Sequence, residues 1–476
     1  MPRKNASGTV RSGGSRTRKL PKDIPAPDYL SAVWKHLTPA LCEEVFALTR
    51  DRERQRKWTL YALMKTWIGL LQCDLSSQTE VIEEYCGKGH PLFPLVEATP
   101  ESFFKRIQSL RPEFFRNVFT RYTSAIQSEF TGNFQQDLNI SAETFPEIFA
   151  FDGSRLAKVG RLLKVARKTS KAIIPGSMEA VYDLRRGCLR ELWFDPDGAK
   201  SEMAMLDKVL DSVPTGSLVV GDRYYPKPVI WRNLKERGIW MVSRYNATVG
   251  KRKIKELKKI RNSGVAIDDW IVEMGGSQYG EEPVTLRWVH VRNGDTKIIL
   301  ITNVLDPNRL SVEQLLQLYG QRWSVERMYL HMKEVLSLNR LFNASPAAVG
   351  QQVYATAILY NALRLSQSKI ADKLKIMPEL LSPDKLFPRV IEKMIQMTVW
   401  ACAAERRTEQ IIFSNPGVKL EVPETDVPDH PMFTLSLKGV LVDKRRGVRR
   451  KRRFCKGRKT WTTYRKIPGA KHLLGN

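Results

Sequence analysis

The chain has 476 residues, of which 42% are hydrophobic and 27% are charged, a composition typical of a folded protein with about two to four domains. Its 78 Lys and Arg against 50 Asp and Glu give a formal net charge of +28, which favours nucleic acid as a partner over an anionic membrane surface. Because no apolar run approaches the roughly 20 residues that span a bilayer and no apolar segment follows the basic N-terminus, we expect neither a membrane span nor a secretory signal.

The six cysteines are scattered along the chain and form no CxxC pair or zinc-finger spacing. Cys86 and His90 lie four residues apart, but no second ligand pair accompanies them, so a zinc site is not expected. This use of cysteine fits a reducing cytoplasm.

The first 145 residues divide into a basic arm and a helical region. Residues 1–25 are rich in Lys, Arg, Gly and Ser, with no acid before Asp23, which predicts a disordered basic arm. Residues 26–145 carry apolar positions at helical spacing and helix-start signals such as Ser77 with Glu80, and Pro112. Several short helices with interspersed Arg and Lys predict a helical DNA-binding domain, and a purely structural helical domain fits nearly as well.

Residues 146–245 have the pattern of a sheet with acids at its strand ends. The apolar run Glu147–Phe151 leads into Asp152, and the run Ser217–Gly221 leads into Asp222. Two further strand-like runs, joined at Gly187, lie between them and form a hairpin. This order predicts a mixed sheet in which the strands that carry the two aspartates are neighbours, so that their carboxylates meet at one edge. Either aspartate alone is a weak signal, since an N-cap or turn residue has the same pattern.

Residues 246–303 interrupt this pattern. A charged stretch, Lys251–Arg261, precedes three strand-like runs at Trp270–Met274, Val284–Val291 and Lys297–Asn303. Turn signals containing Gly separate these runs. We therefore expect a small β-rich insertion, after which residues 304–345 return to the core with a helix that begins near Ser311.

One stripe of this helix gathers four functional side chains. At about 100° per residue, Tyr319, Arg322 and Lys333 each fall within roughly 40° of Glu326. The stripe is about 21 Å long, too long for a single metal site, and suits a metal ligand beside a track of phosphates. A surface helix with an ordinary Arg322–Glu326 pair at i,i+4 spacing is the simpler interpretation.

The C-terminal part divides into a helical region and a basic tail. Residues 346–425 predict two helices, at Ala347–Gln367 and from Pro388 to Cys402, that cap the core or mediate self-association. In residues 426–476, aromatic side chains lie among dense Lys and Arg, as expected for phosphate contacts with base stacking, although a solvated cationic tail is the alternative. The tail residues expected to contact DNA are Arg450, Arg452 and Arg453.

Asp152, Asp222 and Glu326 supply hard oxygen ligands from three separate elements, which suits a pair of Mg²⁺ ions with Mn²⁺ able to substitute. Two such ions about 3.5–4 Å apart can activate a water or a 3′-hydroxyl and stabilise the leaving oxygen. Metal-bound hydroxide can act as the base, so the scheme needs no catalytic His or Cys.

The sequence resembles the bacterial insertion-sequence DDE transposases of the insertion sequence four group. Asp152 in FAFDGS and Asp222 in VVGDRYY match the two aspartate blocks of that group, and the resemblance covers roughly residues 147–345. The match to its Tyr-Arg-Glu-Lys signature is Tyr319-x2-Arg322-x3-Glu326-x6-Lys333. The resemblance implies an α/β fold: an RNase H-like mixed-sheet catalytic core with a β-rich insertion, flanked by helical N- and C-terminal regions.

The resemblance also implies roles for single residues. Asp152, Asp222 and Glu326 would be the catalytic metal ligands. The residues expected to contact DNA in this region are Tyr319, Arg322, Lys333, Trp323, Arg223, Trp270 and Trp288. Members of the group typically cut through a hairpin on the transposon end, with a flipped base held by an aromatic residue of the insertion, for which Trp270 and Trp288 are the candidates. Tyr224 replaces the Gly that often follows Asp-Arg in the family, so the local turn can differ.

The function implied is a cut-and-paste DNA transposase. It would bind the terminal inverted repeats of a mobile element, cleave the strands by two-metal hydrolysis and join the 3′ ends to target DNA. Because two ends must be paired, we expect a homodimer or larger assembly on double-stranded DNA, without a membrane, in the nucleoid of the bacterial cytoplasm. The alternatives are an RNase H-like nuclease without strand transfer and a domesticated DNA-binding protein, although the presence of all three acids argues against the latter.

Overall fold

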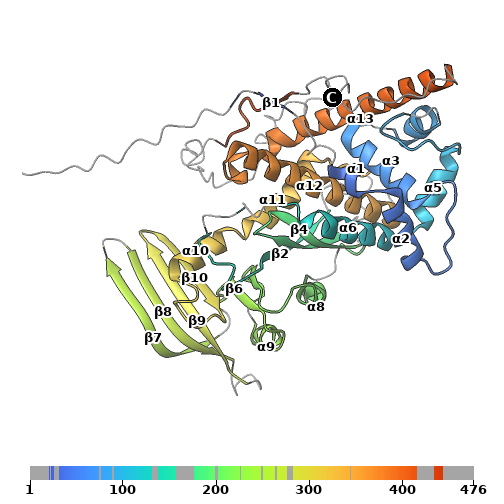
Figure 1. Ribbon diagram of the computed structural model, residues 1–476. Coiled ribbons are helices and arrows are strands. Elements are labelled where there is room, and N and C mark those ends of the chain that lie inside the picture. The colour runs from blue at the N-terminus through green and yellow to red at the C-terminus, as the bar shows by residue number, and fades with distance from the viewer. Residues whose placement is uncertain are drawn as a thin grey trace, which may run out of the picture.

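The structure is a computed structural model, drawn in Figure 1. It describes residues 21, 23–25, 32–73, 77–87, 90–130, 134, 138–156, 176–198, 202–225, 227–247, 250–262, 265–275, 282–343, 345–414 and 434–442, with side chains omitted from 399 to 414. The expected basic arm, apart from residues 21 and 23–25, and the tail residues Arg450, Arg452 and Arg453 lie outside the described residues.

A nine-stranded mixed sheet forms the centre of the structure, in the order β4-β3-β2-β5-β6-β10-β9-β8-β7. Its strands are β2 (Ile148–Arg155), β3 (Ser177–Asp183), β4 (Cys188–Asp195), β5 (Leu218–Gly221), β6 (Trp240–Arg244), β7 (Lys251–Asn262), β8 (Val265–Met274), β9 (Val284–Asn293) and β10 (Thr296–Thr302).

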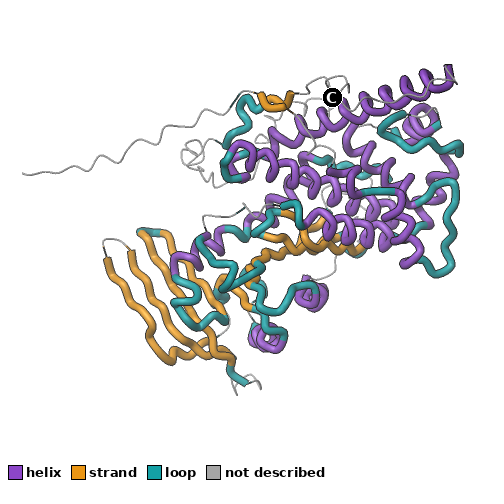
Figure 2. The backbone as a smooth tube through the Cα atoms, viewed as in Figure 1, coloured by secondary structure: helices purple, strands orange, loops and turns teal. Residues whose placement is uncertain are grey.

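The first five strands along this order have RNase H-like topology. β4, β3 and β2 pair antiparallel, and β2, β5 and β6 pair parallel. The expected mixed α/β fold class is therefore confirmed, and the strands that precede Asp152 and Asp222 are direct neighbours. β10 joins β6, so residues 251–302 extend the same sheet away from the N-terminal helices (Figure 1 and Figure 2).

Helices cover both faces of the sheet. The N-terminal helices are α1 (Ala32–His36), α2 (Pro39–Thr49), α3 (Leu60–Cys73), α4 (Gln78–Glu80), η2 (Val81–Cys86), α5 (Pro100–Ser109) and α6 (Pro112–Gln127). Those between or after the strands are η5 (Glu202–Met205), α8 (Leu206–Asp211), α9 (Pro228–Glu236), α10 (Val312–Gly320), α11 (Trp323–Leu330), η7 (His331–Val335), α12 (Pro346–Leu374), η8 (Pro378–Leu380) and α13 (Pro383–Ser414). Apolar side chains of α8 and α9 pack on one face, and those of α10, α11 and α12 pack on the other.

The long helix α12 joins the N-terminal helices to the sheet. The amide of Gln351 on α12 accepts a hydrogen bond from Trp67 Nε1 (3.2 Å) and donates to the carbonyl oxygens of Ile107 and Leu110 (2.8 Å each). α12 also packs on α6 and β4. One hydrophobic cluster consequently runs from the N-terminal helices through the sheet to α13.

A two-stranded sheet lies beside α13, where β1 (Asp23–Pro25) pairs antiparallel with β11 (Thr434–Ser436). Arg389 on α13 donates to the Ser436 carbonyl oxygen (2.7 Å). None of the helices in the described part of the chain combines the length and apolar content that a membrane span needs.

Two sequence predictions about the insertion and the last helix were wrong in detail. The charged stretch Lys251–Arg261, assigned to no strand, is the edge strand β7, where exposed charged side chains are compatible with pairing on one side only. The last helix begins at Pro383 rather than Pro388, because the Ser382 carbonyl oxygen already accepts from the Leu386 backbone N–H. Pro388 is inside the helix.

The expected continuous helix through Tyr319 and Lys333 was also wrong, because the structure divides it into α10, α11 and the π-helix η7. The break comes after Gly320, where the Gln321 and Arg322 backbone N–H groups bond to carbonyls only three residues back. Glycine is a poor helix former, by about 1 kcal/mol relative to alanine, and this favours a break there.

Candidate active site

The sheet register places Asp152 and Asp222 at one edge. Ala150 on β2 lies opposite Val220 on β5 in the parallel pair, and each aspartate follows two residues later. Side chains pack closely against Gly221, the last residue of β5: a Cβ added there would lie only 2.7 Å from Met241 Cε. The local backbone also orients both carboxylates, since the next residue's N–H donates to Oδ1 of Asp152 (3.0 Å) and of Asp222 (2.7 Å).

Arg322 joins the third acid to this edge. Its Nη1 lies 2.6 Å from Glu326 Oε1 and 3.6 Å from Asp152 Oδ2, and the residue is only 7% exposed. Burial would lower the pKa of Arg322, but Glu326, Tyr319 and Asp222 outweigh it and raise that pKa. Asp152 and Glu326 therefore contact one guanidinium group, and the negative charge of Asp222 also acts on it. We call Asp152, Asp222 and Glu326 the carboxylate site.

Tyr319, Trp323 and Lys333 lie beside the carboxylate site. Arg322 Cζ is 6.0 Å from the Tyr319 ring centroid and 5.0 Å from that of Trp323, whose side chain is exposed. Burial, followed by the negative charge of Asp222, raises the pKa of the Tyr319 phenol. Lys333 Nζ donates to Ser154 Oγ (2.6 Å) and to the Arg155 carbonyl oxygen (3.0 Å), which places its ammonium group at the end of β2.

Trp270 and Trp288 are not brought to the carboxylate site. They are cross-strand neighbours on β8 and β9, on the face of the sheet that α8 and α9 cover. Trp288 is 6% exposed, with Lys251 Nζ 4.7 Å and Lys253 Nζ 5.4 Å from its ring centroid. Lys253 Nζ also lies 4.3 Å from the Trp270 centroid. Arg223, by contrast, directly follows Asp222 and is exposed.

Tyr329 and Ser243, which sequence reasoning missed, hold the backbone of two of the acids, and Ser154 holds Lys333. Tyr329 Oη donates to the carbonyl oxygen of Asp152 (2.9 Å) and contacts that of Met178 (3.2 Å). Ser243 Oγ donates to the Asp222 carbonyl oxygen (2.8 Å), and Ser154 accepts from Lys333. Two of them gave a signal in the sequence: Tyr329 lies on the helix of Glu326, and Ser154 closes the FAFDGS block of Asp152.

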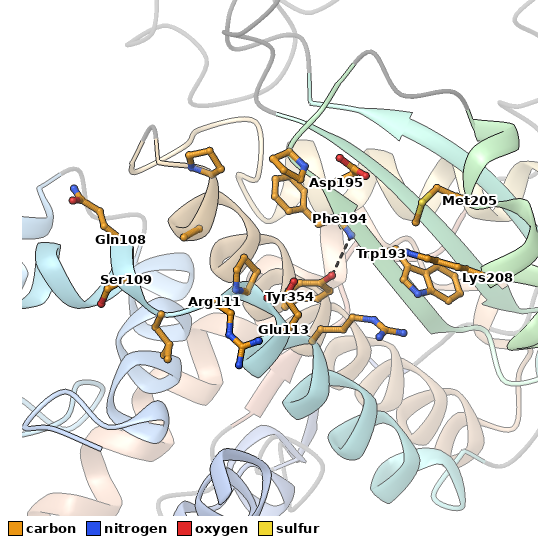
Figure 3. Close-up of a pocket in the computed structure, with 16 residues that line it drawn as sticks. Gln108, Ser109, Arg111, Glu113, Trp193, Phe194, Asp195, Met205, Lys208 and Tyr354 are labelled. Carbon is orange, nitrogen blue, oxygen red and sulfur yellow. Dashed lines mark hydrogen bonds between the residues drawn. The ribbon is translucent and has the colours of Figure 1, made fainter. Parts of the chain in front are cut away.

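The structure also contains a cavity of about 390 Å³, between the α5–α6 junction, the end of β4, α8 and the start of α12 (Figure 3). The Tyr354 hydroxyl beside it accepts a hydrogen bond from the Phe194 backbone N–H (3.1 Å). Cations and acids both line the cavity, including Arg111, Lys208 and Asp195. None of the three acids lines it, so this cavity is separate from the carboxylate site.

Comparison with known proteins identifies the region that carries these acids. Residues 143–362 match the family model described as the transposase DDE domain. This region belongs to the transposase DDE domain family. It contains both aspartate strands, the insertion and the helices up to the middle of α12.

Three bacterial transposases are similar to this chain. The chain is 27% identical over 194 residues to a putative transposase of Sinorhizobium fredii, covering 40% of this chain and 52% of that protein. It is 25% identical over 185 residues to the Escherichia coli transposase for insertion sequence element IS4 (37% and 40% covered). A putative transposase for element IS4SA of Synechocystis is 25% identical over 164 residues (33% and 44% covered). The matched part thus spans about half, or less, of each curated relative, and the expected resemblance to transposases of the insertion sequence four type is confirmed.

Among solved structures, the piggyBac transposase synaptic complex with hairpin DNA aligns with 85% of this chain and 88% of that one. The sequence identity is 11% and the TM-score is 0.38.

Proposed function

We propose that this chain is a DNA transposase that binds the terminal inverted repeats of a mobile element, cleaves their strands and joins the 3′ ends to target DNA. The observation that carries the proposal is that Arg322 contacts both Asp152 and Glu326, next to the neighbouring strand end that carries Asp222, within a transposase DDE domain. Paired element ends require a dimer or a larger assembly, which belongs to the same proposal.

The donor atoms of the carboxylate site fit divalent Mg²⁺ or Mn²⁺, because all three are carboxylates from separate elements and two of them already contact one positive charge. Within the described residues, no three His, Cys, Asp or Glu side chains are spaced as a finished metal site, and the Arg322 guanidinium lies between two of the acids. Bound divalent ions would supply Lewis-acid activation of water or a 3′-hydroxyl and charge stabilisation at the phosphate. Asp152, Asp222 and Glu326 would hold them, and Arg322 would turn away from Asp152.

The remaining side chains around the acids would hold the DNA. The Lys333 ammonium group and the Arg322 guanidinium are suited to phosphate oxygens, and Tyr319 can donate a hydrogen bond. Trp323 and Arg223 are exposed, and we assign both to contacts with the DNA strand that enters the site. We assign end recognition to the helical region 26–145 and further phosphate contacts to the tail, including Arg450, Arg452 and Arg453.

The first prediction tests the three acids. Asp152→Asn, Asp222→Asn and Glu326→Gln should each lower the rate of strand cleavage at least about 100-fold, because each removes a negative charge that the reaction requires. DNA affinity should stay within a few-fold. The measurement is cleavage and strand transfer on duplexes that carry the inverted repeats beside the gene.

Glu313→Gln is the matched control, since Glu313 is an exposed acid on the neighbouring helix α10 and should leave cleavage unchanged. Full activity in any of the three site variants would contradict the assignment. Cleavage by the wild-type chain without a joined product would identify a nuclease, and DNA binding without cleavage would identify a DNA-binding protein.

A further inference from the structure

The strand β7 is an edge of the nine-stranded sheet and is strongly basic. Against the single acid Glu256, its cations are Lys251, Arg252, Lys253, Lys255, Lys258, Lys259 and Arg261. Two of these cations form ion pairs within the insertion: Arg252 pairs with Glu273 (2.5 Å) and Arg261 pairs with Asp268 (2.6 Å). Lys255 and Lys258 are exposed.

A bulge aligns Lys255 and Lys258 on one face. Residues three apart in a regular strand point to opposite faces of the sheet. The register shifts between Glu256 and Lys258, however, so that Lys255 lies opposite Ile271 and Lys258 opposite Asp269, two β8 residues of the same face. The two ammonium groups therefore project from the same side of the edge.

That side is the one that bears the carboxylate site. Asp269 accepts from the buried Arg287 guanidinium, whose Nη1 donates to the Leu310 carbonyl oxygen (2.5 Å) just before α10. α10 and α11, which carry Tyr319 and Glu326, cover this same face of the sheet. Lys251 and Lys253 lie over the tryptophans of the opposite face.

The distance from β7 to the acids follows from the strand order. β7 is five strand spacings from β5, the strand that ends before Asp222. At about 4.8 Å per spacing this is about 24 Å, or about seven base pairs of duplex DNA at 3.4 Å each.

The charge of β7 also decides which partner it fits. An unpaired edge of this length could pair with the edge strand of a second copy, but two such strands would bring their lysines into repulsive contact. A row of cations fits the phosphates of nucleic acid instead.

We propose that β7 is a phosphate-binding edge that contacts duplex DNA through Lys255 and Lys258, about seven base pairs from the bond at the carboxylate site. This inference rests on the proposed function, and it assigns a part of the DNA path to a strand outside that site.

The second prediction measures the salt dependence of binding to a mixed-sequence duplex. Each lost phosphate contact lowers the slope of log affinity against log salt by about 0.9, so Lys255→Gln/Lys258→Gln should lower it by about 1.8. The affinity advantage of the wild-type chain should then shrink about 12-fold between 50 and 200 mM salt. Lys235→Gln/Lys373→Gln, which removes two exposed lysines from α9 and α12, should leave the slope unchanged.

The position is tested with duplexes of the element end in which single phosphates are replaced by uncharged methylphosphonates. Replacement about seven base pairs from the cleaved bond should weaken wild-type binding and have no effect on the double variant. Equal slopes for the variant and the wild-type chain, or equal sensitivity at that phosphate, would overturn the inference while cleavage still supports the proposed function. Failure of the wild-type chain to bind any duplex would overturn both.

Discussion

Arg322 shows how one side chain can organise a site made of acids. Its guanidinium contacts Glu326 at 2.6 Å and Asp152 at 3.6 Å, and Asp222 contributes to its raised pKa. Three acids at one sheet edge would otherwise repel one another, so Arg322 balances their charge when no other cation does. A divalent ion at the same acids would compete with this guanidinium.

The third prediction concerns this competition. Arg322→Gln should destabilise the metal-free chain by about 1–2 kcal/mol, a value below that of a fully buried pair because Glu326 is 32% exposed. Mg²⁺ should raise the melting temperature of the variant more than that of the wild-type chain. Thermal unfolding with chelator and with Mg²⁺ measures both effects.

Arg327→Gln, on the same helix, is the control and should show no extra response to Mg²⁺. An equal response of the wild-type and Arg322→Gln chains would contradict a role for Arg322 as the balancing cation.

The positions of Asp152 and Asp222 at neighbouring strand ends could be predicted from the sequence. The side chains that contact this edge from other elements could not. Asp152 and Asp222 each follow an apolar run, a local pattern that the sheet register then brings together. Tyr329 contacts the Asp152 carbonyl across 177 positions, and Lys333 contacts Ser154 across 179. No local pattern encodes such contacts, because they depend on how the helix crosses the sheet.

At the scale of elements, the fully buried Arg287–Asp269 pair connects the insertion to the core. The side chains of Arg287 and Asp269 are 0% and 1% exposed, and Arg287 also donates to the Leu310 carbonyl oxygen before α10. The helix that ends next to the carboxylate site is thereby fixed to β8 and β9.

The fourth prediction follows from that burial. Asp269→Leu leaves the Arg287 charge unpaired and should lower the free energy of unfolding by about 3–5 kcal/mol, whereas Arg287→Met/Asp269→Leu should recover most of the loss. Urea denaturation of the two variants checks this. If the double variant is as unstable as Asp269→Leu, the loss of stability comes from the packing of the two side chains and not from the unpaired Arg287 charge.

Element boundaries were predicted best where the pattern was apolar. The runs around β2 and β5 were recognised, but the basic strand β7 has no alternation of apolar and polar residues, because one side of an edge strand is open to solvent. The single helix expected at Tyr319–Lys333 failed for a different reason. Gly320 was the local hint of a break, and Lys333 lies in a π-helix, a rare form that regular helical spacing does not predict.

At the scale of the whole molecule, Glu129 connects the start of the helical region to α12. It contacts Lys35 (2.9 Å) and His36 (2.6 Å) on α1 and also pairs with Lys369 on α12. Burial alone would raise the pKa of Glu129, but the hydrogen bonds from Lys369, Lys35 and His36 outweigh it and lower that pKa to about 2.

The fifth prediction is a pH dependence. Since the pKa of Glu129 is lower in the folded chain, its contribution is complete above the ordinary value of 4.5 and is lost as the pH falls toward 2. Across this interval the wild-type chain should lose about 1–3 kcal/mol of stability that Glu129→Gln does not lose. Denaturant titrations at several acidic pH values measure the difference, and parallel curves for the two chains would refute the assignment.

The pairing of β1 with β11 has a consequence for the order of folding during synthesis. Ile24 lies opposite Leu435, so roughly 410 residues are made between the two strands. A ribosome that adds about 5–20 residues per second needs about 20–80 seconds for that stretch. Throughout this time β1 lacks the strand that it pairs with, and its hydrogen bonds to β11 can form only after Thr434–Ser436 have been translated.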